Sequence, residues 1–134
     1  MKKVAIPAKM QKFYGIGTML HPGKEMVEAM IKEIPVGKVA TIDSLCHRLA
    51  RDHDTNVTCP MRTSHLVKAI METSAGSSAS IPCWRVIRKN HLLINSPFTP
   101  LCAENLEKEG FQVSQNSKEE FKVQNIEDRL FTFL

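Results

Sequence analysis

The stretch Ser80-Ile81-Pro82-Cys83-Trp84-Arg85-Val86-Ile87, SIPCWRVI, decides how the whole chain is interpreted. It places the only tryptophan of the sequence next to one of its four cysteines. After it, the segments WRVIRK and HLLIN flank Lys89-Asn90, a pattern that predicts a short hairpin, or wing, turning at Asn90. The question that this stretch raises is whether Cys83 is a nucleophile or a buried thiol.

Length and composition indicate one soluble globular domain. The 134 residues suffice for one hydrophobic core but not for two, and 43% hydrophobic with 24% charged residues is an ordinary balance. No run of about 18 apolar residues predicts a membrane span. The start, MKKVAIPAKM, does not have the pattern of a signal peptide. We therefore expect no membrane association and a cytoplasmic location.

The cysteines are too widely spaced to indicate a disulfide framework, and no Cys-x-x-Cys pair occurs. In a reducing compartment they are predicted to be free thiols. A metal site assembled from Cys46, His47, His53 and Cys59 would match no structural zinc spacing. The sequence therefore predicts neither a metal nor a cofactor.

Charge is distributed unevenly along the chain. Residues 1–51 carry a net charge of +5 and residues 52–100 a net charge of +2, whereas residues 101–134 carry −3. A basic first two-thirds is compatible with a polyanionic partner, of which nucleic acid is the commonest. A solvated surface with a mild excess of lysine explains the charge equally well.

Three amphipathic helices are predicted in the first half of the chain. KEMVEAMIKEI (24–34) has apolar residues at helical intervals, and Thr41 is a candidate N-cap for IDSLCHRLARD (42–52), whose buried stripe is Ile42, Leu45 and Leu49. A third helix, 61–73, buries Leu66, Val67, Ile70 and Met71 and exposes Arg62, Ser64, His65 and Lys68. A helix pair with a basic second helix is typical of a helix-turn-helix, although many such pairs do not bind DNA.

The remaining segments complete a mostly α fold of the α/β class. We expect an irregular extension over 1–20, the domain proper over 21–112, and an acidic extension over 113–134 packed on the same domain. A small-residue loop, SAGSSAS (74–80), precedes the quoted stretch. A last helix is predicted from Thr99-Pro100 to Gly110 with Leu101 and Leu106 inward. One or two edge strands follow, for which FQVSQ (111–115) and RLFTFL (129–134) are the candidate segments, with a loose terminus.

Taken in order, IPVGKVAT (34–41), the helix pair, SIPCWRVI and LEKEG (106–110) resemble the C-terminal domain of the methylated-DNA–protein-cysteine methyltransferases and of the non-enzymatic alkyltransferase-like proteins. The resemblance covers roughly residues 24–110. It implies a winged helix-turn-helix-like fold with a short wing. In the family motif, Pro-Cys-His-Arg-Val, the cysteine accepts an alkyl group from O6 of guanine, and a glutamate holds the histidine that removes the thiol proton through a water.

By this resemblance Cys83 and Glu109 match the catalytic cysteine and glutamate, and Arg85 matches a structural arginine. The base position is occupied by Trp84, whose indole donates a hydrogen bond but accepts no proton. Trp84 either fills the former lesion pocket as core or offers a platform on which an extruded base stacks. Glu109 has a second interpretation as an ordinary helix-terminal glutamate.

The DNA-contacting positions depart from the family pattern as well. The tyrosine that turns the phosphate during base flipping corresponds to Ile42, and the intercalating arginine corresponds to His65, with Arg62 one turn earlier on nearly the same face. Ala69 alone keeps a small side chain where the family helix approaches the minor groove. The resemblance implies a DNA-binding surface made of Lys38, Thr41, Arg62, Ser64, His65, Lys68 and Ala69.

Three functions remain open at this point. The first is a DNA-binding protein with little or no alkyl transfer, connected with DNA repair or lesion sensing; the second is an active methyltransferase that accepts the alkyl group on Cys83. The third is a protein-interaction module that uses the acidic C-terminal segment. Under the first two, the expected partner is double-stranded DNA, with alkylated DNA as one candidate form, bound by a monomer.

Overall fold

The computed structural model describes residues 1–74 and 81–133. Its N-terminal segment is a hairpin with two short helices between its strands: β1 (Lys2–Ala5), η1 (Ala8–Met10), α1 (Gln11–Tyr14) and β2 (Thr18–His21). The prediction of an irregular segment over 1–20 was therefore wrong. The strands form because Ile6 and Met19 are buried together with Cys59 in a small core of their own.

The N-terminal hairpin is joined to the rest of the domain through β4 (Val57–Thr58). β2 pairs in parallel with β4, with Met19 opposite Val57 and Leu20 opposite Thr58. These pairs make a three-stranded sheet in the order β1-β2-β4. The hairpin is thus part of the sheet that leads into the helix after β4, rather than a loose arm.

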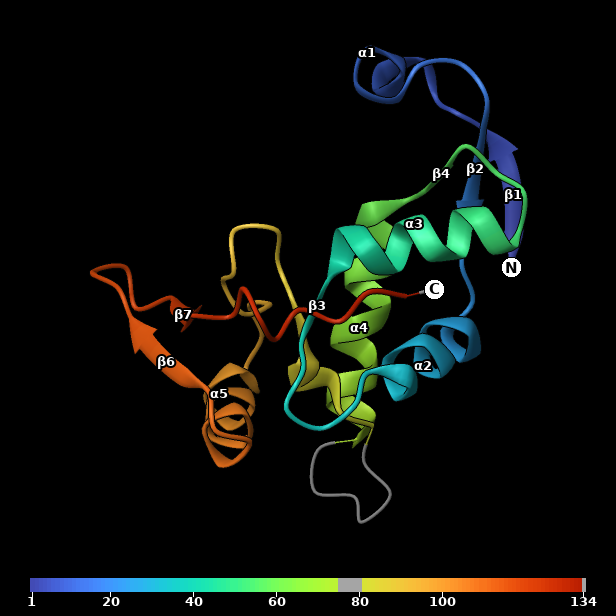
Figure 1. Cartoon of the computed structure of the whole chain (residues 1–134). Helices are drawn as coiled ribbons and strands as arrows, with labels where there is room; N and C mark the ends of the chain where they lie inside the picture. The colour runs from blue at the N-terminus through green and yellow to red at the C-terminus, as the bar shows by residue number, and fades with distance from the viewer. Residues whose placement is uncertain (75–80, 134) are drawn as a thin grey trace.

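Three helices form the centre of the molecule (Figure 1): α2 (Lys24–Glu33), α3 (Ile42–Asp52) and α4 (Pro60–Ser74). All three were predicted. Thr41 caps α3 because its side-chain oxygen accepts a hydrogen bond from the backbone N–H of Ser44 at 3.2 Å. The predicted stripe of Ile42, Leu45 and Leu49 is buried, as are Val67, Ile70 and Met71 of α4, while Leu66 is half-buried.

The quoted stretch forms a single 3-10 turn, η2 (Cys83–Arg85), followed by β5 (Val86–Ile87). β5 pairs in parallel with β3 (Ala40–Thr41), the residues just before α3. The chain then turns back, since Ile87 forms an antiparallel bridge with Leu93 and the side chain of Asn90 accepts from the N–H of Leu92. The loop predicted at 74–80 lies outside the described residues, apart from the backbone of its first residue at the end of α4.

The last third of the chain contains α5 (Thr99–Lys108) and an antiparallel hairpin of β6 (Gln112–Gln115) and β7 (Phe121–Gln124). Gly110 ends α5 in a left-handed conformation (φ +91°), as predicted. Leu106 is buried, but Leu101 is 43% exposed, so its predicted inward position was wrong. Leu101 lies on the outer side of the first turn of the helix, whereas the next residue along the chain is buried.

The C-terminal prediction was also wrong in part. β6 lies where FQVSQ predicted a strand, but its partner is β7, which was missed. No strand occurs within residues 129–133, where Leu130 makes only an isolated bridge with Val39. The end of the chain is not loose either. Phe133 is buried in the main core, as is Ile126 a few residues earlier.

In residues 1–74 and 81–133, no helix is both long and apolar enough to cross a membrane. Over the same ranges, no three His, Cys, Asp or Glu side chains gather closely enough to hold a metal ion.

Candidate functional site

Cys83 lies at the start of η2 and is 3% exposed. Burial, the largest cause, and smaller contributions from Cys102 and Glu28 together raise the pKa of its thiol to about 12, although a backbone hydrogen bond lowers it. A thiolate is the reactive form of cysteine. At neutral pH this side chain is therefore an uncharged thiol inside the core.

Trp84 occupies the position next to Cys83 and is half-buried against the core. Its indole N–H donates a hydrogen bond to Oε2 of Glu109. The guanidinium of Arg85 lies 5.6 Å from the centre of the Trp84 ring. The side chain of Trp84 therefore contacts Glu109. Its indole nitrogen already carries a proton and cannot accept another one.

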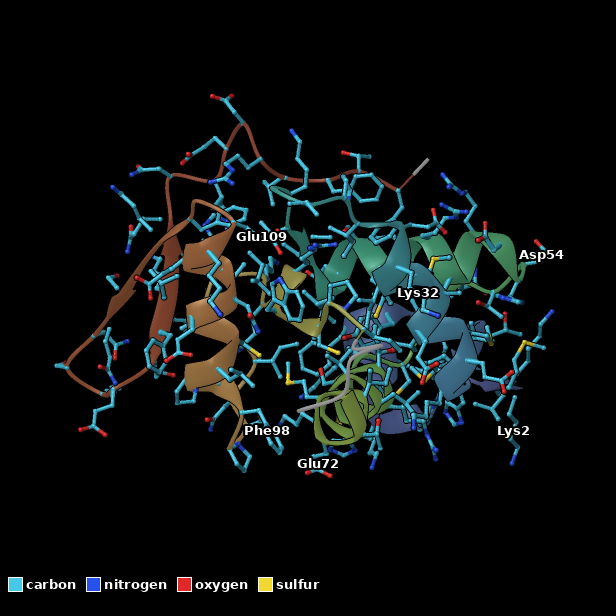
Figure 2. The ribbon with its side chains drawn as sticks, turned by 90° about the horizontal axis from the view of Figure 1, so that it is seen from below. Lys2, Lys32, Asp54, Glu72, Phe98 and Glu109 are labelled. Carbon is cyan, nitrogen blue, oxygen red and sulfur yellow. The ribbon has the colours of Figure 1, made fainter. Side chains whose placement is uncertain are left out.

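Glu109 is the centre of a buried polar cluster (Figure 2, which labels it at the end of α5). Its Oε1 accepts from the backbone N–H of Gly37 at 2.9 Å. Both carboxylate oxygens accept from Nε of Arg85 at 3.2 and 3.1 Å, and the two side chains are 9% and 12% exposed. Glu109 is therefore more than a helix-terminal residue, because it joins the end of α5 to η2 and to the turn after α2.

Arg85 extends this cluster to α2. One of its terminal guanidinium nitrogens donates to the backbone carbonyl of Ile34 at 2.9 Å. Its partners are thus a carboxylate on one side and a helix-end carbonyl on the other. This geometry agrees with the structural role that the resemblance implies for Arg85.

Arg129, in the C-terminal segment, closes the cluster from outside. It donates to the backbone carbonyls of Gly37, Gly110 and Glu109 at 3.0, 2.9 and 2.8 Å. Its guanidinium also lies 3.5 Å from the centre of the Phe111 ring. Sequence reasoning missed Arg129, and no pattern in the sequence points to it, because its hydrogen-bond acceptors are backbone carbonyls.

The predicted contact residues on α4 lie on its outer side. Arg62 and His65 are exposed, while Ser64, Lys68 and Ala69 are half-buried. Within the described part of the chain, Arg62, His65 and Lys68 form no ion pair with a carboxylate. The cationic groups of Arg62 and Lys68 are therefore available to an external anion, and the imidazole of His65 lies beside them as a hydrogen-bonding group.

The other predicted contact residues have partners within the fold. The ammonium of Lys38 donates to the backbone carbonyl of Asp128 at 3.0 Å, and the hydroxyl of Thr41 is the cap of α3. Ile42, at the position of the family's tyrosine, is 7% exposed. The structure brings Cys83, Trp84, Arg85 and Glu109 together. Lys38 and Thr41 do not belong to the outer face of α4, because they lie in the segment before α3.

The fold that carries this cluster is that of the alkyltransferase-like proteins, as the motifs predicted. Two solved structures show it. One is S. pombe Atl1 in complex with damaged DNA containing O6-carboxymethylguanine, with a TM-score of 0.61 and 20% identity over 82% of this chain and 94% of that chain. The other is S. pombe ATL in complex with DNA, with a TM-score of 0.59 and 21% identity over the same shares. No family model and no curated protein sequence matches the chain.

Proposed function

We propose that this chain is a DNA-binding protein that recognises damaged duplex DNA on an alkyltransferase-like scaffold without transferring an alkyl group to Cys83. The hydrogen bond from the indole of Trp84 to Glu109 carries this proposal. It places a group that accepts no proton where an alkyltransferase needs its base. In this proposal the scaffold around Cys83 is kept, but Trp84 does not supply the base that would ionise the thiol.

The electrostatics of Cys83 support the same conclusion. Transfer would form a bond between the cysteine sulfur and the alkyl carbon, break the bond from that carbon to guanine O6, and leave the thiol proton on guanine. The sulfur attacks as a thiolate, yet burial raises the pKa of Cys83 to about 12. With no base beside it, less than one thiol in about ten thousand is ionised at neutral pH.

The outer face of α4 provides the binding surface. Arg62, His65 and Lys68 are available to phosphate oxygens, and neutralising phosphates supplies most of the affinity of a protein for DNA. Similarity to two S. pombe proteins bound to DNA, one of them on an O6-alkylated guanine, makes damaged duplex DNA the proposed ligand. Ser64 and Ala69 complete this face, and the turn between Ile87 and Leu93 is the proposed wing.

Lys38 and Thr41 are proposed to have a smaller part. Both already have hydrogen-bond partners within the fold. They contribute to DNA binding only through side-chain atoms that remain accessible at the start of α3, and we expect their loss to weaken binding less than the loss of Arg62.

The test is intact-protein mass spectrometry after incubation with a duplex containing O6-methylguanine, together with a band-shift assay on this duplex and on its unmodified twin. We expect a band shift that weakens with salt and no increase in mass. A gain of one methyl group, mapped to Cys83 and abolished by Cys83→Ala, would overturn the proposal and establish the enzyme. Absence of a salt-sensitive shift on either duplex would contradict DNA binding itself.

A further inference from the structure

The N-terminal segment is a purely basic unit. Residues 1–21 contain the four lysines Lys2, Lys3, Lys9 and Lys12 and no aspartate or glutamate. All four lysines are exposed. The segment was expected to be an irregular extension, but its strands and its own small core give it a fixed shape.

This unit is held rigidly against the start of α4. The N–H of Cys59, one residue before the helix, donates to the carbonyl of Leu20 at 2.9 Å. The backbone N–H of Thr18 donates to the side chain of Asn56 at 2.9 Å, and the N–H of Asn56 donates to the carbonyl of Thr18 at 3.1 Å. The hairpin therefore keeps one position relative to the proposed DNA-binding helix.

The positive charges of the hairpin and of α4 lie close to one another. The pKa of His21, on β2, is lowered first by burial and then by the positive charges of Arg62 and Lys2. These three residues come from β2, α4 and β1. The basic surface of α4 thus continues across the helix start onto the hairpin.

The short helix α1 also lies near the start of α4, across a shared hollow. Tyr14 of α1 lines a hollow of about 280 Å³ together with Pro60 at the start of α4 and Lys89 of the proposed wing, and Asp43 adds one negative charge there. Beside Tyr14, the ring of Phe13 is 71% exposed, with the ammonium of Lys12 5.0 Å from its centre. Lysines next to exposed aromatic rings are typical of surfaces that bind single-stranded nucleic acid, and for a duplex the lysines alone supply the phosphate contacts.

We propose that residues 1–21 form a second DNA contact, in which Lys2, Lys3, Lys9 and Lys12 bind phosphates of the duplex beyond the segment held by α4. This inference rests on the proposed function and lengthens its binding site. The protein therefore binds a longer duplex more tightly than the face of α4 alone allows.

The test compares two charge-neutralised proteins by salt titration of their affinity for duplexes of about 12 and 24 base pairs, lengths chosen on either side of the extended site. One carries Lys2→Gln, Lys3→Gln, Lys9→Gln and Lys12→Gln. The matched control also loses four lysines: Lys32→Gln in α2, Lys108→Gln at the end of α5, and Lys118→Gln and Lys122→Gln in the β6–β7 hairpin, which lies at the opposite end of the molecule from the N-terminal strands (Figure 1). All eight lysines are exposed, so both proteins are expected to fold, which their thermal unfolding verifies.

The fourfold variant should lower the slope of log K against log salt by about 0.9 for each phosphate that the protein no longer neutralises, or about 3.6 units in all, and it should not prefer the longer duplex. The control should keep both the slope and the preference. Retention of the wild-type slope and length preference in the fourfold variant would overturn the second contact while leaving binding through α4 intact. An equal fall of the slope in the control would overturn it too, because the effect would then be that of net charge. If wild-type protein binds neither duplex, the proposed function and this inference both fail.

Discussion

The polar cluster around Glu109 and the outer face of α4 use their charges in opposite ways. In the cluster, the carboxylate accepts from Gly37, Trp84 and Arg85, so its charge is used within the fold. On α4, Arg62 and His65 are exposed and have no carboxylate partner among the described residues. The comparison teaches that the charge at the end of α5 is satisfied by contacts within the fold, while the exposed side chains of α4 have no carboxylate partner among the described residues.

The largest expected effect comes from removing the centre of the cluster. Glu109→Ala leaves Arg85 charged, buried and without a carboxylate, so we expect the free energy of unfolding to fall by about 3–5 kcal/mol. Urea unfolding followed by circular dichroism measures this decrease. The control is Glu107→Ala on the exposed side of the same helix, which should stay within about 0.5 kcal/mol of wild type. A Glu109 variant as stable as its control would show that the cluster is not structural.

The reactivity of Cys83 tests the same region chemically. Because burial raises the pKa of its thiol to about 12, iodoacetamide should modify it at pH 8 about a hundredfold more slowly than a free cysteine, allowing for the greater nucleophilicity of a more basic thiolate. The rate should rise about tenfold for each pH unit up to pH 11, since the folded protein holds the proton beyond the pH at which a free thiol loses it. Peptide mapping by mass spectrometry follows the modification. Modification of folded protein at the rate of the urea-unfolded chain would contradict the buried-thiol interpretation.

The indole hydrogen bond can be removed without removing the ring. Trp84→Phe keeps an aromatic side chain beside Arg85 but takes one donor from Glu109, so we expect the free energy of unfolding to fall by about 1.5 kcal/mol. Trp84→His is the informative companion, because it supplies a group that accepts a proton. If Trp84→His gains methyl transfer to Cys83 in the mass-spectrometric assay, the tryptophan alone blocks the chemistry; if it does not, burial of the cysteine blocks it too.

The open surface of α4 should show the smallest effect on stability and a distinct effect on binding. Arg62→Ala with Lys68→Ala should leave unfolding within about 0.5 kcal/mol of wild type and lower the salt slope of DNA binding by about 1.8. Fluorescence anisotropy on a labelled duplex measures the slope. Lys118→Ala with Lys122→Ala serves as the control of equal charge. A slope that stays at the wild-type value in the α4 variant would remove this face from the proposed interface.

Local signals made the central helices predictable. The cap at Thr41, the periodic stripe of α3 and the glycine after α5 all act within a few residues, and each was found where it was expected. The N-terminal strands and β7 were missed, although β6, which has the same length of four residues, was predicted. In the N-terminal hairpin, the burial of Met19 depends on packing against Cys59, forty residues later, which no local pattern reveals.

The candidate site was predictable only through its motifs. Cys83 and Glu109 were selected by resemblance, and the structure brings their neighbourhoods together. The resemblance did not predict that Trp84 would donate a hydrogen bond to Glu109. The motif shows only that an indole stands where the family has an imidazole, and it does not show whether the indole reaches the glutamate. No sequence pattern predicts the position of Arg129. Its guanidinium binds three backbone carbonyls, and a backbone carbonyl is present at every residue and therefore identifies no partner.

Arg129 also has a consequence for how the chain folds as it is made. Its hydrogen bond to Gly37 joins residues 92 positions apart, and Val39 bridges to Leu130 in the same place. At a translation rate of about 5–20 residues per second, the ribosome needs about 5–20 seconds to add the residues between them. During that interval α2, α3 and α4 leave the ribosome, while the carbonyl of Gly37 still lacks the hydrogen bond from Arg129. The cluster is therefore complete only after residue 129 has been added, and a nascent chain that stalls before that residue exposes the unfinished cluster.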